Sequence, residues 1–268
     1  MVSDSCKKRF GNIMMEDMEL VAQEEIAPRI YSMILKGEMV EQMLPGQFLH
    51  IRVPDGSKLL RRPISISEID PETQTCRLIY RIEGGGTAIF SQLPVGSKLS
   101  VMGPQGNGFD LTKLGQGQKA LIIGGGIGVP PLVQVAKQLH EQGVEVEVVV
   151  GFATKEAVIL EEELSQVAHV TVTTDDGTYG TKGYVSTVVE QMDQEFDAIY
   201  SCGAPGMLKY VNTKFHDHPR AYISMESRMA CGMGACYACV VHLENESQAA
   251  NKRVCEDGPV FETGTIVM

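Results

Sequence analysis

The sequence predicts three units of β plus α/β architecture: a small antiparallel barrel, a parallel α/β sheet and a short cysteine-rich tail. Three observations predict this. Short strands fill residues 17–113, apolar strands alternate with helical segments over 114–218, and four cysteines crowd into 219–268. A chain of 268 residues is long enough for two or three compact domains. Residues 1–16 fit none of the three units and are expected to form an extension.

The barrel is predicted because short strands recur at regular spacing between turns rich in Pro, Gly and Asp. The strands read "RIYSMILKG", "QFLHIRV", "PISISEID" and "CRLIYRIEG". The stretch "LLRRPISI" places Arg61, Arg62 and Ser65 close together, and the turn "EGGGTA" follows the last of these strands. A forked cation, a hydroxyl and free backbone donors suit a diphosphate. Arginines that only face solvent are the alternative.

The parallel sheet is predicted from fully apolar strands that alternate with amphipathic segments. Its first strand runs into "LIIGGGIGVPPL", a G-x-G-x-x-P pattern formed by Gly126, Gly128 and Pro131. A glycine turn before a helix allows backbone N–H groups and the helix dipole to hold a diphosphate. A later strand ends in "YSCGAPGM", which places Cys202 and Gly203 at the edge where open parallel sheets bind ligands. A merely buried thiol is the alternative for Cys202.

The tail carries the spacing C-x4-C-x2-C-x15-C, formed by Cys231, Cys236, Cys239 and Cys255. One loop supplies three thiolates and a distant turn the fourth, as in plant-type [2Fe-2S] ligation; most zinc sites use two short knuckles instead. The intervening glycines allow the loop to turn tightly and to aim N–H groups at the sulfurs. A [2Fe-2S] site is therefore predicted, with zinc as the alternative.

Composition excludes several classes of partner. The net charge of −11 and the pI near 5.1 argue against nucleic acid and against an anionic membrane surface. No apolar run reaches the length of a membrane span, and the first residues lack the apolar centre of a signal peptide. Seven cysteines, four of them in one segment, favour metal ligation in a reducing compartment over disulfides. We therefore expect a cytoplasmic protein.

This order of motifs resembles the ferredoxin reductase superfamily and, within it, the iron–sulfur flavoprotein subunits of NAD-dependent dihydroorotate dehydrogenases. The resemblance runs from Met18 to the end of the sequence. It is carried by "PGQF", "RRPISI", "GGGIGVPPL", "TDDGTYGTKG", "CGAPGM", "ESRMACGMGACYAC" and "CEDGPVF". It implies an FAD-binding barrel, a nicotinamide-nucleotide domain and a small [2Fe-2S] domain.

The resemblance also implies roles for individual positions. Three segments would bind FAD: Arg62, Pro63, Ile64 and Ser65, then Ile79, Tyr80 and Arg81, then Gly86 and Thr87. The glycine loop would bind the nicotinamide nucleotide through Gly125, Gly126, Gly128 and Pro131. Cys202 would act beside the nicotinamide ring, with Gly203 next to it. The four cysteines of the tail would ligate the cluster.

The function implied is electron transfer in pyrimidine biosynthesis. Electrons would pass from the FMN of a catalytic dihydroorotate dehydrogenase subunit through [2Fe-2S] and FAD to NAD+, in a heterotetramer of two subunits of each kind. A flavin belongs between the other carriers because a cluster passes single electrons and a nicotinamide takes a hydride. Two alternatives remain open: a similar subunit of another NAD(P)-linked oxidoreductase, and a non-catalytic redox-sensing module.

NAD is favoured over NADP because Lys155 is the only cation in "GFATKEAV", the stretch that follows the second parallel strand. Asp175 and Asp176 are candidates to lie near the nucleotide, although two aspartates beside a glycine also suit a solvated loop. Cys6 and Cys76 are expected to be free thiols without an assigned role.

Overall fold

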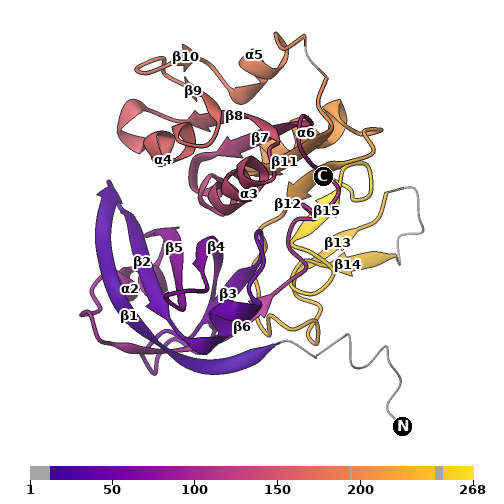
Figure 1. Ribbon diagram of the computed structural model, residues 1–268. Helices are drawn as coiled ribbons and strands as arrows, with labels where there is room; N and C mark the ends of the chain where they lie inside the picture. Colours follow the sequence, from indigo (N-terminus) through magenta and orange to yellow (C-terminus); the bar gives the residue numbers. More distant parts are fainter. Residues whose placement is uncertain (1–12, 194, 245–249) are drawn as a thin grey trace.

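The computed structural model describes residues 13–193, 195–244 and 250–268. Cys6 and most of the expected extension lie outside the described residues. The described chain forms a closed barrel, a seven-stranded sheet and a two-stranded hairpin (Figure 1). This confirms the predicted fold class.

The barrel consists of six antiparallel strands in the order β1-β2-β5-β4-β3-β6. These are β1 (Met14–Ala27), β2 (Ile30–Lys36), β3 (Phe48–Ile51), β4 (Arg62–Asp70), β5 (Thr75–Arg81) and β6 (Lys98–Gln105). Two short helices accompany them, η1 (Glu38–Gln42) and α2 (Gly85–Phe90). Alternate side chains such as Leu49, Ile51 and Leu78 fill the barrel, and Phe90 of α2 packs there as well. Cys76 is a free thiol in this core.

The sheet runs in the order β10-β9-β8-β7-β11-β12-β15, and every pairing is parallel except that of β15. Its strands are β7 (Lys119–Gly125), β8 (Glu145–Phe152), β9 (His169–Thr174), β10 (Thr181–Lys182), β11 (Ala198–Cys202), β12 (Ala221–Ser224) and β15 (Val260–Glu262). The helical segments are η2 (Gly126–Gly128), α3 (Pro130–Glu141), η3 (Lys155–Ala157), α4 (Glu161–Ser165), α5 (Val185–Val189) and α6 (Pro205–Lys214). The helices α3 and α4 share one core with the barrel side of the sheet, while α5 and α6 pack on the opposite face.

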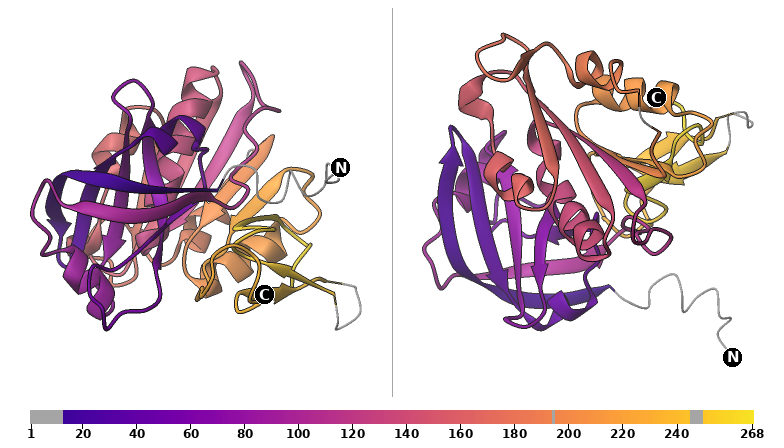
Figure 2. Two further views of the ribbon diagram at one scale, coloured as in Figure 1. Left: turned by 90° about the horizontal axis from the view of Figure 1, so that it is seen from below. Right: turned by 45° about the horizontal axis from the view of Figure 1, so that its top comes forward.

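The cysteine-rich tail is joined to the sheet more closely than the sequence suggests. Sequence patterns place the end of the sheet before residue 219, yet β12 and β15 both belong to it. Between these two strands the chain makes the cysteine loop and the hairpin of β13 (Val240–His242) and β14 (Asn251–Arg253). Both views of Figure 2 show this part of the chain beside the β12 edge of the sheet.

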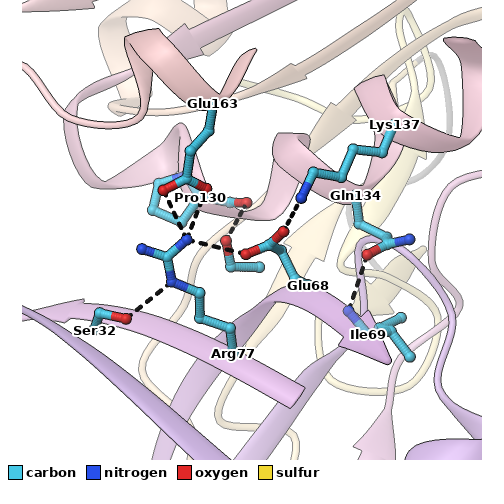
Figure 3. A network of polar contacts seen from close by, with 9 residues as sticks. Ser32, Glu68, Ile69, Arg77, Pro130, Gln134, Lys137 and Glu163 are labelled. Carbon is cyan, nitrogen blue, oxygen red and sulfur yellow. Dashed lines mark hydrogen bonds and ion pairs between the residues drawn. The ribbon is translucent and has the colours of Figure 1, made fainter. Parts of the chain in front are cut away.

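An ion-pair network joins the barrel to the sheet unit (Figure 3). Arg77 on β5 donates to Glu163 of α4 at 2.7 Å and to Glu68 on β4 at 3.0 Å. Its Nε also donates to the Ser32 hydroxyl at 2.9 Å, and Lys137 of α3 forms an ion pair with Glu68. One guanidinium thus links three elements and neutralises two carboxylates, which fixes how α3 and α4 sit on the barrel.

Two further hydrogen bonds tie α3 to the same strand. The Ser67 hydroxyl donates to the carbonyl of Pro130 at 3.0 Å, and the amide of Ile69 donates to the Gln134 side chain at 2.9 Å. The outer face of β4 therefore lies directly against the first turns of α3. Among the described residues, no helix is long and apolar enough to cross a membrane.

Removing the Arg77 guanidinium tests this interface. Arg77→Ala leaves Glu68 and Glu163 near each other without their shared cation, so the free energy of unfolding should fall by about 2 kcal/mol. Urea unfolding followed by circular dichroism measures this change. The control is Lys98→Ala, because Lys98 pairs with Glu19 at side chains that are 59% and 44% exposed. That variant should lose less than about 1 kcal/mol, and equal losses in the two variants would contradict the role of Arg77.

Candidate functional site

The first part of the site is the outer face of the barrel along β4. Directly opposed residues in antiparallel strands share a face, so Ser65 points the same way as Phe48, and Pro63 the same way as His50. Phe48 packs in the core shared by the sheet and the tail, which shows that this face points out of the barrel. Ser65 therefore lies between the contact with α3 and the contact with the tail, while Ile64 packs toward the barrel core.

Arg62, the first residue of β4, meets the start of α2. A Cβ atom placed on Gly86 would lie 2.6 Å from Nε of Arg62, so the guanidinium passes directly over the first turn of α2. Arg62 also donates to the carbonyl of Leu60 at 2.6 Å. The Thr87 hydroxyl accepts the amide of Gly84 at 3.3 Å and holds the turn closed. Sequence reasoning assigned Arg62, Gly86 and Thr87 to one site, and the structure brings them together.

The segment Ile79–Arg81 divides between the two sides of β5. Ile79 packs in the core shared with the sheet, and Arg81 is exposed and paired with Glu83. Tyr80 instead points into the barrel, where its hydroxyl donates to Gln23 at 3.0 Å; burial raises the pKa of this phenol. A group bound on the outer face can meet the side chains of Ile79 and Arg81, but only the backbone of Tyr80.

The glycine loop and the Cys202–Gly203 turn are in direct contact. Gly126 has a φ of 53°, a conformation that glycine adopts without strain. Gly128 is needed for space, because a Cβ there would lie 2.5 Å from the Cα of Gly203 and 2.6 Å from the carbonyl carbon of Cys202. Pro131 is buried in the first turn of α3. The predicted nucleotide residues therefore form one contiguous cluster at the carboxyl ends of β7 and β11.

A cavity of about 500 Å³ opens beside this surface. It is lined by residues at the carboxyl ends of the parallel strands and by the start of α6, among them Gly125, Phe152, Asp175, Tyr184, Met207 and Tyr210. In the part of the chain that the structure describes, none of its lining residues is Lys or Arg. Open parallel sheets bind nucleotides at this edge. A lining with a carboxylate and no cation suits the ribose of NAD, which carries no 2′-phosphate.

Cys202 is a buried thiol at the end of β11. Burial raises its pKa, and the charge of Glu226 raises it further. The thiol therefore stays protonated at neutral pH, so it can pack and donate a weak hydrogen bond but does not act as a thiolate nucleophile.

The cysteine loop surrounds its sulfurs with backbone donors. Gly232 and Gly234 adopt φ values of 70° and 77°, which turn the loop inward. The amide of Gly234 donates to Sγ of Cys255 at 3.1 Å, and the amide of Cys236 donates to Sγ of Cys231 at 3.4 Å. Burial raises the pKa of the Cys231 thiol, but hydrogen bonds from the Met233 amide and from the thiol and amide of Cys236 outweigh it and lower the pKa to about 7. A loop built this way stabilises thiolates, as a metal cluster requires.

The sulfur of Cys231 interacts with that of Cys236, and the sulfur of Cys255 interacts with those of Cys239 and Cys231. Among the described residues, no three metal-ligating side chains are gathered around one point. A single zinc ion needs four ligands around one centre, whereas each iron of a [2Fe-2S] rhomb takes two thiolates. Four thiolates supplied by one loop and a later turn can give each iron of a [2Fe-2S] cluster two ligands.

Arg253 on β14 holds the cysteine loop in place through several polar contacts. Its guanidinium donates to the carbonyl of Gly234 at 2.9 Å, pairs with Glu256 at 2.6 Å and with Asp257 at 3.1 Å, and lies 5.1 Å from the Tyr237 ring centre. The loop conformation therefore depends on one cation that reaches across from the hairpin.

Family models match the chain in three consecutive segments. Residues 17–109 match an oxidoreductase FAD-binding domain and residues 122–213 an oxidoreductase NAD-binding domain. Residues 226–267 match the iron–sulfur cluster binding domain of dihydroorotate dehydrogenase B.

Curated relatives match over almost the full length. The electron transfer subunit of dihydroorotate dehydrogenase B (NAD(+)) from Streptococcus mutans is 68% identical over 256 residues, 96% of this chain and 99% of the relative. The chain belongs to this family. The family member from Geobacillus thermodenitrificans is 48% identical over 255 residues, 94% of this chain and 98% of the relative. The family predicted from sequence motifs is thereby confirmed.

Solved structures agree on the fold of this dihydroorotate dehydrogenase B family member. A chain of the NADH-dependent reduced ferredoxin-NADP oxidoreductase superposes with a TM-score of 0.83 at 27% identity, over 94% of this chain and 90% of that one. A cytochrome P450 reductase from Amycolatopsis gives 0.68 at 20% identity, over 79% and 69%, which supports the fold alone.

Sequence reasoning missed several residues around these sites. Arg253 had no motif of its own, and Glu226 became visible only because the fold brings it near Cys202. His50 and Gln105 are buried against the cysteine loop from strands far away in the sequence. A lone histidine in the apolar strand "QFLHIRV" was the one available signal, and it does not reveal what the imidazole faces.

Gly128→Ala tests the contact between the glycine loop and β11. The added methyl group has no room beside Gly203, so the loop must move and NADH should bind about tenfold more weakly. Fluorescence titration with NADH measures the Kd. Gly115→Ala is the control, because no atom lies within 4 Å of its added Cβ. An unchanged Kd in the Gly128 variant would show that the contact does not shape the nucleotide site.

Arg253→Gln tests the support of the cysteine loop. Without the guanidinium, the loop loses the hydrogen bond to the Gly234 carbonyl and two ion pairs. A chelator should therefore remove iron faster, and the visible absorbance of the iron–sulfur cluster should disappear about tenfold faster. The rate is followed by stopped-flow or manual mixing. Lys252→Gln is the matched control, because Lys252 is the exposed neighbour of Arg253. Identical bleaching rates in wild type and the Arg253 variant would contradict this role.

Proposed function

We propose that this chain is the electron transfer subunit of an NAD-dependent dihydroorotate dehydrogenase. It would carry electrons from the FMN of a catalytic subunit to NAD+ by way of a [2Fe-2S] cluster and FAD, in the biosynthesis of pyrimidines. The observation that carries the proposal is 68% identity over 96% of the chain to a relative of that name, with segments that match FAD-binding, NAD-binding and iron–sulfur cluster binding domains.

The flavin, when bound, supplies the exchange between one-electron and two-electron transfer that cluster and nicotinamide cannot make directly. We assign its binding to Arg62, Pro63, Ile64 and Ser65 on β4, to Ile79, Tyr80 and Arg81 on β5, and to Gly86 and Thr87 on α2. Within this set, the Arg62 guanidinium and the turn at Gly86 would hold the diphosphate. The Ser65 hydroxyl would face the flavin between the sheet and the tail.

The nicotinamide nucleotide is assigned to the loop of Gly125, Gly126, Gly128 and Pro131. Gly203 and the neutral thiol of Cys202 would close the site beside the ring. The thiol would orient the ring and exclude water there, because it stays protonated. Asp175 in the cavity favours NAD over NADP, since a 2′-phosphate would meet a carboxylate and no lining cation.

The cluster is assigned to Cys231, Cys236, Cys239 and Cys255. Cys236 is exposed, and the ring of Tyr237 beside it is 57% exposed with a φ of 57°. We infer that this side of the loop faces the FMN-containing catalytic subunit, in a heterotetramer of two subunits of each kind. An exposed aromatic ring next to a ligand suits such an interface.

Co-expression with the catalytic subunit tests the function. The complex should contain two irons, two sulfides and one FAD for each copy of this chain. It should form orotate with stoichiometric reduction of NAD+, and the chain alone should not oxidise dihydroorotate. If the complex contains iron, sulfide and FAD in these amounts but does not form orotate, the chain takes its electrons from a different donor. A colourless protein that contains zinc would refute the proposal. Cys76→Ser is the control variant, because Cys76 is a buried barrel thiol away from the four ligands.

A further inference from the structure

Two polar side chains are buried at the barrel surface with incomplete hydrogen bonding. Both ring nitrogens of His50 and both amide atoms of Gln105 lack a well-aligned hydrogen bond within the described residues, although the backbones of Arg61 and Cys231 lie near the imidazole. The two side chains are 0% and 1% exposed. Native proteins seldom leave buried polar groups unpaired, because each such group costs free energy. Two such side chains in one place indicate that they serve a group outside the polypeptide.

The cysteine loop covers both side chains. A Cβ on Gly232 would lie 2.3 Å from Nδ1 of His50 and 2.8 Å from Oε1 of Gln105. Gly232 directly follows the ligand Cys231. His50 and Gln105 therefore meet the loop at the peptide that presents a cluster sulfur, and only a glycine allows this approach.

The strand register places the same imidazole beside the proposed flavin site. His50 is paired with Pro63, two residues along β4 from Ser65, and shares their outward face. Gln105 is paired with Phe48, the neighbour of Ser65 across the strands. The two side chains thus lie where the flavin face and the cysteine loop meet.

We propose that His50 and Gln105 form a hydrogen-bonding site for the [2Fe-2S] cluster that tunes its reduction potential. This inference rests on the proposed function and deepens it. An imidazole N–H and an amide N–H directed at cluster or cysteine sulfur stabilise the reduced, more negative cluster and raise its potential. Both side chains contact Gly232, next to the ligand Cys231, and this contact is the reason to assign them to the cluster and not to the flavin, with the Gln105 amide turned so that its N–H faces the sulfur. Both residues act on the cluster's potential and position; neither exchanges electrons.

Redox titration followed by electron paramagnetic resonance tests the inference in the complex with the catalytic subunit. His50→Leu removes the donor and should shift the cluster equilibrium at least tenfold toward the oxidised state, about 59 mV for one electron. Gln105→Leu should shift it in the same direction. His50→Gln keeps an N–H donor and should restore most of the potential.

Phe48→Leu is the matched control, because Phe48 lies on the same outward face and packs in the core that includes Cys239 and Cys255. It loosens packing without removing a donor, so its cluster potential should stay at the wild-type value. The inference is overturned if His50→Leu keeps the wild-type potential, if Phe48→Leu shifts it equally, or if only the flavin potential moves. If the His50→Leu variant does not bind a cluster, the potentials of the Gln105→Leu and His50→Gln variants test the inference. It is then overturned if Gln105→Leu keeps the wild-type cluster potential. A wild-type complex without a cluster would instead refute the proposed function.

Discussion

Close backbone approach is the constraint on which the rest of this structure depends. At three places segments that are distant in the sequence touch where a glycine leaves no Cβ: Gly128 against Gly203, Gly232 against His50, and Gly106 against Pro259. The first joins the nucleotide loop to β11, and the other two press the tail onto the barrel. Ordinary side chains at these positions would hold the surfaces apart, and electron transfer between carriers needs them close. The glycines therefore determine how closely these segments approach one another.

The polar contacts complement these close approaches. Arg77 joins the barrel to α4 and Arg253 joins the hairpin to the cysteine loop, each through a guanidinium that meets two carboxylates. A planar cation with several donors can satisfy such groups from different directions, which a lysine cannot do. The nucleotide side and the cluster side of the molecule are thus each fixed by one arginine, while the proposed flavin face lies between them on the barrel.

Much of this could be read from the sequence, because its signals are local. Cysteine spacing, the glycine turn after an apolar strand and the Arg-Pro-Ile-Ser stretch each lie within a few residues, so they predicted the sites and the family. The remainder depends on contacts between distant segments. Strand register decides that Tyr80 points inward, β15 pairs with β12 across the whole tail, and His50 meets a loop about 180 residues away. No local pattern encodes such pairings.

The position of β15 also orders events during synthesis. The free edge of β12 can be covered only after the entire cysteine loop has left the ribosome, because β15 follows that loop. Until then, the nascent sheet presents unpaired N–H and C=O groups, which invite pairing with other chains. A chain truncated within the cysteine loop would lack β15, so the edge of β12 would stay unpaired. Protection from aggregation is thereby coupled to complete translation of the segment that carries the cysteines.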